Sequence, residues 1–246
     1  NFGVRAYGID QAFLRWEALG VDYSSDIVIF GFQPENMARN VNIFRPFFIP
    51  GDSGFPFSKP RFVLSNDSLE LINSPCPSPT EMLAIIDDIF GWKMMQYEHW
   101  CNPADYESHF WNHSKLLCLG QKVLEKFRRQ EDRSYYVTEL QDLAFAITRA
   151  FSQSVHRTGA DFVIVYLPSG LELQNLLQGR HMCDKLLHDF GSLGTVIDPS
   201  EPMYREMRQH GTVETLLPGH YSALGNRIVA ESVFAQLEVM LASRKK

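Results

Sequence analysis

A histidine near the end of the chain has the setting of a catalytic base. His220 follows Gly219 in a loop, directly before an amphipathic stretch predicted to form the last helix. An imidazole titrates near neutral pH, so it can take a proton from a nucleophile and return it to a leaving group. By residue type alone, a structural histidine hydrogen-bonded near a helix start remains the alternative interpretation.

An asparagine in the first part of the chain is a second candidate. Residues 26–32 form an apolar run typical of a buried parallel strand, and Asn36 follows it closely. Open α/β sheets build their sites at the carboxyl ends of the strands. An amide placed there could donate a hydrogen bond to a developing oxyanion, whereas an ordinary turn asparagine is the alternative.

The elements that must position these residues alternate between strand and helix. The patterns predict a helix from Ile9 to about Gly20, a hairpin over 59–72 and helices over 137–157, 171–190 and 222–241; strands are predicted at 26–32, 161–168 and 194–198, and residues 1–4 as a strand end. Thr80 is predicted to cap a helix, within an aromatic-rich, helical stretch from about 80 to 135. The alternation predicts a parallel sheet with helices on both faces, in a single domain, 1–246, with 80–135 as an insertion.

The order of four blocks resembles the SGNH/GDSL hydrolases, a family of serine esterases. The blocks are residues 1–8, the strand and asparagine at 26–36, the strand at 161–168 and the histidine block at 219–228. The resemblance spans almost the whole chain and implies a three-layer α/β/α, flavodoxin-like fold. It also implies an esterase or carbohydrate deacetylase that uses a serine acyl-enzyme and needs no metal or organic cofactor, with a small-molecule or carbohydrate ester as substrate.

The resemblance assigns roles to three residues. His220 would be the base, and the Asn36 side chain and the Ala6 backbone N–H would be oxyanion donors. The family usually has a glycine at the position of Ala6, and alanine keeps the donor if φ stays negative. Glu35 stands where many relatives carry a small residue.

The aspartate that orients the histidine in the family is missing. Leu217 and Pro218 occupy its positions. Either another carboxylate such as Glu214 reaches the imidazole, or the enzyme works as a Ser–His dyad, or the site is degenerate.

The nucleophile is expected upstream of Asn1, on a first strand that is missing here. Its absence predicts a gap in the sheet, or a loose N-terminal segment with unpaired backbone groups, in a poorly stable and inert fragment. Ser53, in Gly51–Asp52–Ser53, is the runner-up nucleophile. Because Pro50 and Pro56 flank it, a surface turn is the expected structure there.

Composition and other patterns narrow the remaining classes. The formal charge of −6 argues mildly against a nucleic-acid binder. No apolar run has the length of a membrane span, but membrane association and compartment stay open, because a targeting segment could precede Asn1. The four cysteines fit free thiols or one or two bridges. His109 and His113 are spaced i, i+4, and their aromatic neighbours favour packing over a metal site.

Two further functions belong to the alternatives. A catalytically inactive SGNH-like binding domain would explain the missing aspartate and the Glu35 variation. An acyltransferase of the same fold would transfer its acyl group to a sugar in place of water.

Overall fold

The computed structural model describes residues 1–49, 57–66, 68–107, 109, 113–120, 123–124, 137–210 and 212–244. The chain divides into two compact units. The first consists of Asn1–Asn40 with Gln141–Lys246, and the second is Val41–Leu140. The stretch predicted as an insertion, 80–135, falls in the second unit. Whether the chain forms one domain stays a prediction.

The first unit is built on a three-stranded parallel sheet in the order β1-β4-β5. The strands are β1 (Ile27–Phe32), β4 (Asp161–Tyr166) and β5 (Thr195–Ile197). These are the three apolar runs that the sequence indicates, and β4 is buried almost throughout. The predicted α/β class with a parallel sheet is therefore confirmed.

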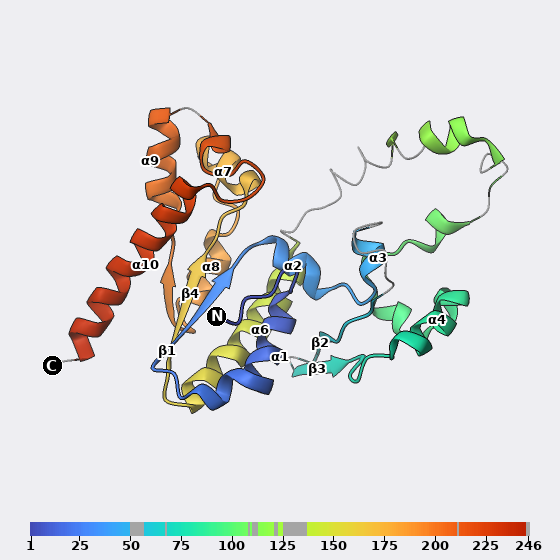
Figure 1. The fold of residues 1–246 in the computed structure, drawn as a ribbon, viewed down its shortest axis with the longest axis horizontal. Helices are drawn as coiled ribbons and strands as arrows, with labels where there is room; N and C mark the ends of the chain where they lie inside the picture. The colour runs from blue at the N-terminus through green and yellow to red at the C-terminus, as the bar shows by residue number, and fades with distance from the viewer. Residues whose placement is uncertain are drawn as a thin grey trace. The chain divides into compact units, whose positions relative to one another are not determined.

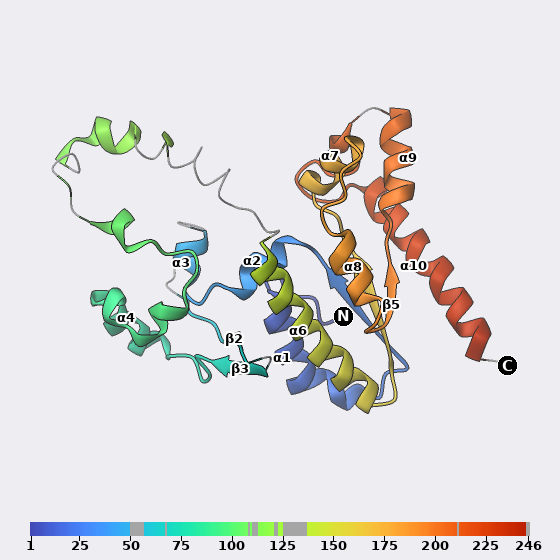
Figure 2. The ribbon, with the colours of Figure 1, turned by 180° about the vertical axis from the view of Figure 1, so that it is seen from behind.

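Helices cover both faces of this sheet (Figures 1 and 2). The helices of this unit are α1 (Ile9–Leu19), α2 (Glu35–Asn40), α6 (Thr138–Arg157), α7 (Gly170–Leu177), α8 (Asp184–Phe190), α9 (Ser200–His210) and α10 (Ala223–Arg244), with single turns η1 (Gly20–Tyr23) and η6 (Val213–Thr215). On one face Phe30 packs on Phe151 of α6, with ring centroids 5.5 Å apart. On the other, Val163 and Ile197 lie in one cluster with Val233 of α10.

The first helix begins where the sequence predicts, but its cap comes from elsewhere. Gly8 precedes the helix, and a Cβ there would lie 2.9 Å from Asn40 Oδ1. That oxygen accepts a hydrogen bond from Ile9 N at 2.9 Å, across 31 residues of sequence. A buried side chain of α2 thus satisfies one of the free N–H groups of α1.

Two local predictions in this unit are wrong, and one helix was missed. Residues 171–190 form two helices, because Gly179 has φ +70° and ends α7. Residues 1–4 form no strand. Helix α9 was not predicted, since its eleven residues are mostly polar and carry a proline.

The second unit holds the predicted hairpin. Its elements are α3 (Arg45–Phe48), β2 (Arg61–Ser65), β3 (Ser68–Ile72), α4 (Pro79–Asp87), η2 (Ile89–Gly91), η3 (Lys93–Tyr97) and η4 (Pro103–Tyr106). The expected cap at Thr80 is wrong, because α4 begins one residue earlier. Ser78 caps it, and Glu81 completes a capping box.

All four cysteines are free thiols. In the part of the chain that the structure describes, each helix is too short or too polar to cross a bilayer.

Candidate functional site

The segments that carry His220 and Asn36 are each hydrogen-bonded to the segment that follows β4, at the carboxyl edge of the parallel sheet. Phe32 O, at the end of β1, accepts a hydrogen bond from Leu167 N at 2.8 Å. One residue further along the chain, the carbonyl oxygen of Pro168 accepts a hydrogen bond from Tyr221 Oη at 2.6 Å. Two hydrogen bonds therefore join the strand that precedes Asn36 to the residue that follows His220. This edge is where α/β sheets place their sites.

The imidazole of His220 is oriented by its own neighbour. Nδ1 lies 2.8 Å from Gly219 O. A carbonyl can only accept, so Nδ1 carries the proton and the neutral ring keeps a lone pair on Nε2. The side chain is exposed, and none of the described carboxylates, Glu214 included, forms a hydrogen bond or ion pair with it. The backbone carbonyl therefore does what the missing aspartate would do for the tautomer.

Asn36 lies in the first turn of α2. Its backbone N–H donates to Gln33 O at 2.9 Å, which anchors the turn. Its partly buried side-chain amide makes no hydrogen bond to another residue that the structure describes. The neighbouring Glu35 is paired with Arg39, one turn further along the helix. The amide of Asn36 is therefore free to donate to a ligand.

Ala6 departs from the expectation on which its role depended. Its φ is +68°, in the left-handed region, so the expectation of a negative φ is wrong. The conformation is the one that glycine adopts without penalty, and in alanine Cβ crowds the backbone. Within the described chain, Ala6 N–H has no hydrogen-bond partner. The N–H of Ala6 is therefore unpaired among the described residues, but the backbone condition stated for this donor is not met.

A groove of about 610 Å³ runs beside β1. One wall is formed by residues 27–31 of the strand, and residues 1–4 with Tyr7 and Gly8 line it as well. Asn36 also lines the groove. Its volume is that of ordinary ligand pockets.

Among the residues that the structure describes, no strand pairs with β1 on the side away from β4. Asp26 O and Phe32 O accept hydrogen bonds from the segment of β4. Because backbone direction alternates along a strand, Ile27, Ile29 and Gly31 point their N–H and C=O groups away from β4. Since β1 is the end strand of the sheet, these groups face an open edge. Ile29 is 49% exposed there.

A buried acid lies at the same carboxyl edge. Glu172 in the first turn of α7 is only 5% exposed. Its Oε2 accepts from Ser169 N at 2.6 Å, while Oε1 is buried without a partner among the described residues. Burial raises the pKa of Glu172 to about 7; the hydrogen bond from Ser169 N lowers the pKa in part, and the charge of Glu35 raises it. The sequence analysis missed Glu172, although Ser169 and Glu172 have the spacing of a capping box.

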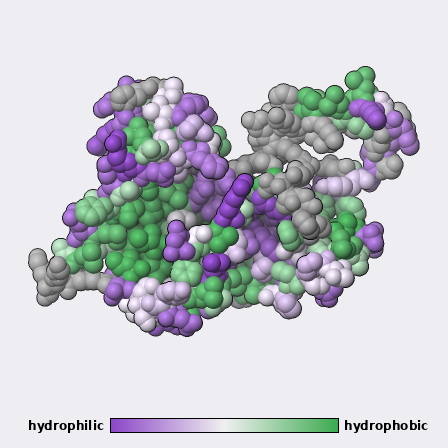
Figure 3. All heavy atoms as spheres, viewed as in Figure 1, coloured by the Kyte–Doolittle hydropathy of each residue, from purple (hydrophilic) through white to green (hydrophobic). Residues whose placement is uncertain are grey.

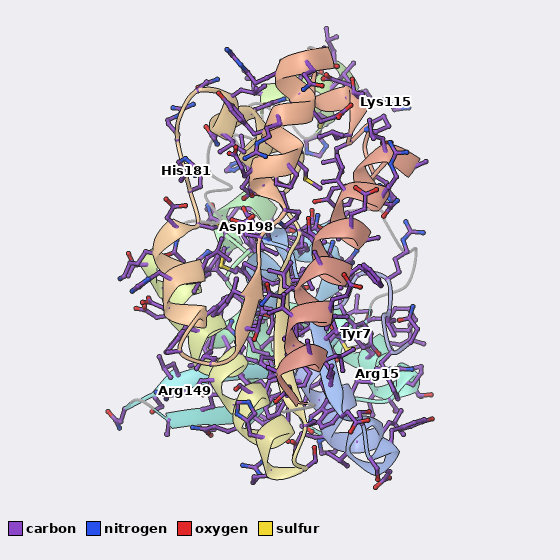
Figure 4. The ribbon with its side chains drawn as sticks, turned by 90° about the vertical axis from the view of Figure 1, so that its left-hand side faces the viewer. Tyr7, Arg15, Lys115, Arg149, His181 and Asp198 are labelled. Carbon is purple, nitrogen blue, oxygen red and sulfur yellow. The ribbon has the colours of Figure 1, made fainter. Side chains whose placement is uncertain are left out.

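A small cavity adjoins Glu172. It holds about 20 Å³ and is lined by Tyr166 and Cys183 among others. Asp198, which also lines it, lies at the carboxyl end of β5 in Figure 4, with His181 on the connection before α8. The acidic and phenolic groups at this edge are thus gathered around one buried carboxyl.

Two of the predicted features lie wholly or partly outside the described residues. Gly51–Ser53, the runner-up nucleophile segment, is one of them. His109 and His113 are described, but residues 110–112 between them are not. Among the described side chains, no three histidine, cysteine or acidic groups are arranged to hold a metal ion.

Comparisons with protein-family models, with curated proteins and with solved structures each find no match. The assignment of a function therefore depends on the site alone.

Proposed function

We propose that this chain carries the base and the oxyanion donors of an SGNH-type hydrolase that cleaves carboxylic esters. The observation that carries the proposal is His220: its ring is exposed at the carboxyl edge of the sheet, with Nδ1 bonded to Gly219 O. That arrangement leaves Nε2 free to accept a proton, as a serine hydrolase requires.

The proposed reaction has two steps. A serine Oγ attacks the ester carbonyl carbon while His220 Nε2 takes the hydroxyl proton and passes it to the departing alkoxide. Water then attacks the acyl carbon and loses a proton to Nε2; the acyl–Oγ bond breaks, Nε2 returns the proton to serine Oγ, and the acid product leaves. In both steps the amide of Asn36 and the N–H of Ala6 donate to the negative oxygen.

The groove beside β1 supports a position for the serine. A strand added there would pair with Ile27, Ile29 and Gly31, whose backbone groups face the open edge. If the strand ran parallel to β1, its carboxyl end would lie at the edge that holds Asn36. We propose that the nucleophile stands at the end of such a strand, upstream of Asn1, in a three-layer flavodoxin-like fold.

A fluorophosphonate probe tests the proposal. The 246-residue chain and the product of its complete reading frame are each treated with the probe, and the modified residue is mapped by mass spectrometry. We expect labelling of an upstream serine in the complete product, reduced at least 100-fold by His220→Ala. His188→Ala is the matched control, because His188 lies in α8 away from the site loops and should leave labelling unchanged.

Other results of the labelling experiment would favour one of the alternative functions or another nucleophile. Labelling of Ser53 would move the nucleophile to the turn. A folded complete product without any labelling would overturn the hydrolase and favour a non-catalytic binding domain, for which the absence of a described carboxylate partner of His220 is the supporting observation. Transfer of the acyl group to a sugar in excess of hydrolysis would identify an acyltransferase.

A further inference from the structure

A single peptide group connects the buried acid to the loop of His220. The carbonyl of Pro168 and the N–H of Ser169 belong to the same peptide unit. Tyr221 Oη donates to that carbonyl at 2.6 Å, and Glu172 Oε2 accepts from that N–H at 2.6 Å. Hydrogen bonds on the two sides of one peptide group polarise each other. A change in the charge of Glu172 therefore alters the strength of the hydrogen bond that Tyr221 donates.

The Glu172 carboxyl is not fully satisfied in this position. Its second oxygen, Oε1, is buried and has no partner in the described chain. When the group is ionised, that oxygen carries charge without a donor, close to the carboxylate of Glu35. When it is protonated, the charge disappears and the bond to Ser169 N weakens, because a neutral acceptor is poorer than a charged one.

We propose that Glu172 is a positioning residue. Its protonation state changes the strength of the hydrogen bond between Tyr221 Oη and Pro168 O, and this bond positions the loop that carries His220. Glu172 touches neither substrate nor reacting atoms. The importance of this coupling for catalysis rests on the function proposed above. The coupling itself is a property of the free protein.

The charged and titratable groups around Glu172 come from several elements. Glu35 of α2 raises the pKa of Glu172. The charge of Glu172 in turn raises the pKa of Tyr221 and of Cys183, after the larger effect of burial on each. The other polar groups that line the adjoining cavity are Tyr166, Arg180, His181, Asp184, Asp198 and Ser200. The effect of the Glu172 charge on the pKa of Tyr221 places the two groups within electrostatic reach of each other.

Amide chemical shifts measured across a pH series test the coupling without substrate. The ¹⁵N-labelled chain carries His220→Ala, so that the histidine does not titrate beside the amides that are followed. We expect the Ser169, Gly219 and Tyr221 amides to shift with a common midpoint near pH 7, where Glu172 titrates. Glu172→Gln should abolish this step at all three amides. Glu201→Gln, an exposed first-turn glutamate of α9, should leave it unchanged.

Tyr221→Phe separates the two halves of the connection. It removes the hydrogen bond to Pro168 O and keeps Glu172. The chemical shift of the Ser169 amide should still change near pH 7, while that of the Gly219 amide should no longer depend on pH. In the chain that carries His220→Ala alone, a midpoint below pH 5 for the Ser169 amide would overturn the proposal. A Gly219 amide whose chemical shift does not change together with that of Ser169 would overturn it as well. Because no step uses a substrate, a failed labelling experiment leaves this result standing, and the reverse also holds.

Discussion

At the scale of single residues, Ala6 is the clearest point of strain. Its φ of +68° costs an alanine about 1 kcal/mol relative to glycine. Ala6→Gly should therefore raise the free energy of unfolding by about 1 kcal/mol, even though glycine makes the unfolded chain more flexible. The quantity to measure is the hydrogen-exchange free energy of the β4 amides, which report on the core of the first unit.

Ala12→Gly is the matched control for this prediction. Ala12 lies inside α1, where the same replacement should lower the free energy of unfolding by about 1 kcal/mol. Equal losses at both positions would show that the left-handed conformation of Ala6 carries no strain.

The sequence predicted the location of the site residues better than their environment. The loop of His220 and the strand before Asn36 could be found because glycines and an apolar run bound them. The bond from His220 Nδ1 to Gly219 O could not, since it depends on a φ of +90° at Gly219. Glu172 was missed because its burial is a consequence of packing against other segments.

At the scale of elements, prediction succeeded where apolar residues form an unbroken run, as in the strands, or recur at helical spacing, as in the helices. The three strands and helices α1, α6 and α10 follow such patterns. It failed where a contact distant in sequence, or a short polar segment, decides the structure. Residues 1–4 form no strand because a strand needs a hydrogen-bonding neighbour, and within the described chain they have none.

The first turn of α7 should make stability depend on pH. The pKa of Glu172 is about 7 in the folded chain, against 4.5 as its ordinary value. The folded state therefore binds the proton more tightly, so this contribution to stability is fully present below about pH 4.5 and is lost as pH rises to about 7. The loss is on the order of 3 kcal/mol for a shift of this size.

Glu172→Gln should remove this dependence. The free energy of unfolding of the variant, followed between pH 5 and 8 by denaturant titration, should change less with pH than that of the parent chain. The exposed Glu201→Gln should keep the parent slope. A Glu172→Gln variant with that slope unchanged would show that Glu172 ionises as an ordinary surface carboxyl.

At the scale of the whole molecule, the edge of β1 that faces away from β4 has no partner strand among the residues that the structure describes. Figure 3 shows a broad apolar area over α10 and the neighbouring strands. Ile29 of β1 and Phe234 of α10 are exposed apolar side chains of these elements. An unpaired strand edge next to such a surface is a template for pairing with another strand, and soluble proteins usually cover it.

Ile29→Pro tests whether the complete protein covers this edge with its own chain. The N–H of Ile29 points away from β4, so a proline there removes no hydrogen bond between residues that the structure describes and is tolerated as on other edge strands. In the product of the complete reading frame, an added strand would lose a ladder bond and meet the proline ring. We expect the β4 amides to lose less than about 1 kcal/mol of exchange free energy in the first protein and about 3 kcal/mol in the second. Val28→Pro, whose N–H faces β4, should destabilise both proteins alike. If Ile29→Pro has the same small effect in both, the groove beside β1 holds no strand, and the nucleophile must be sought elsewhere.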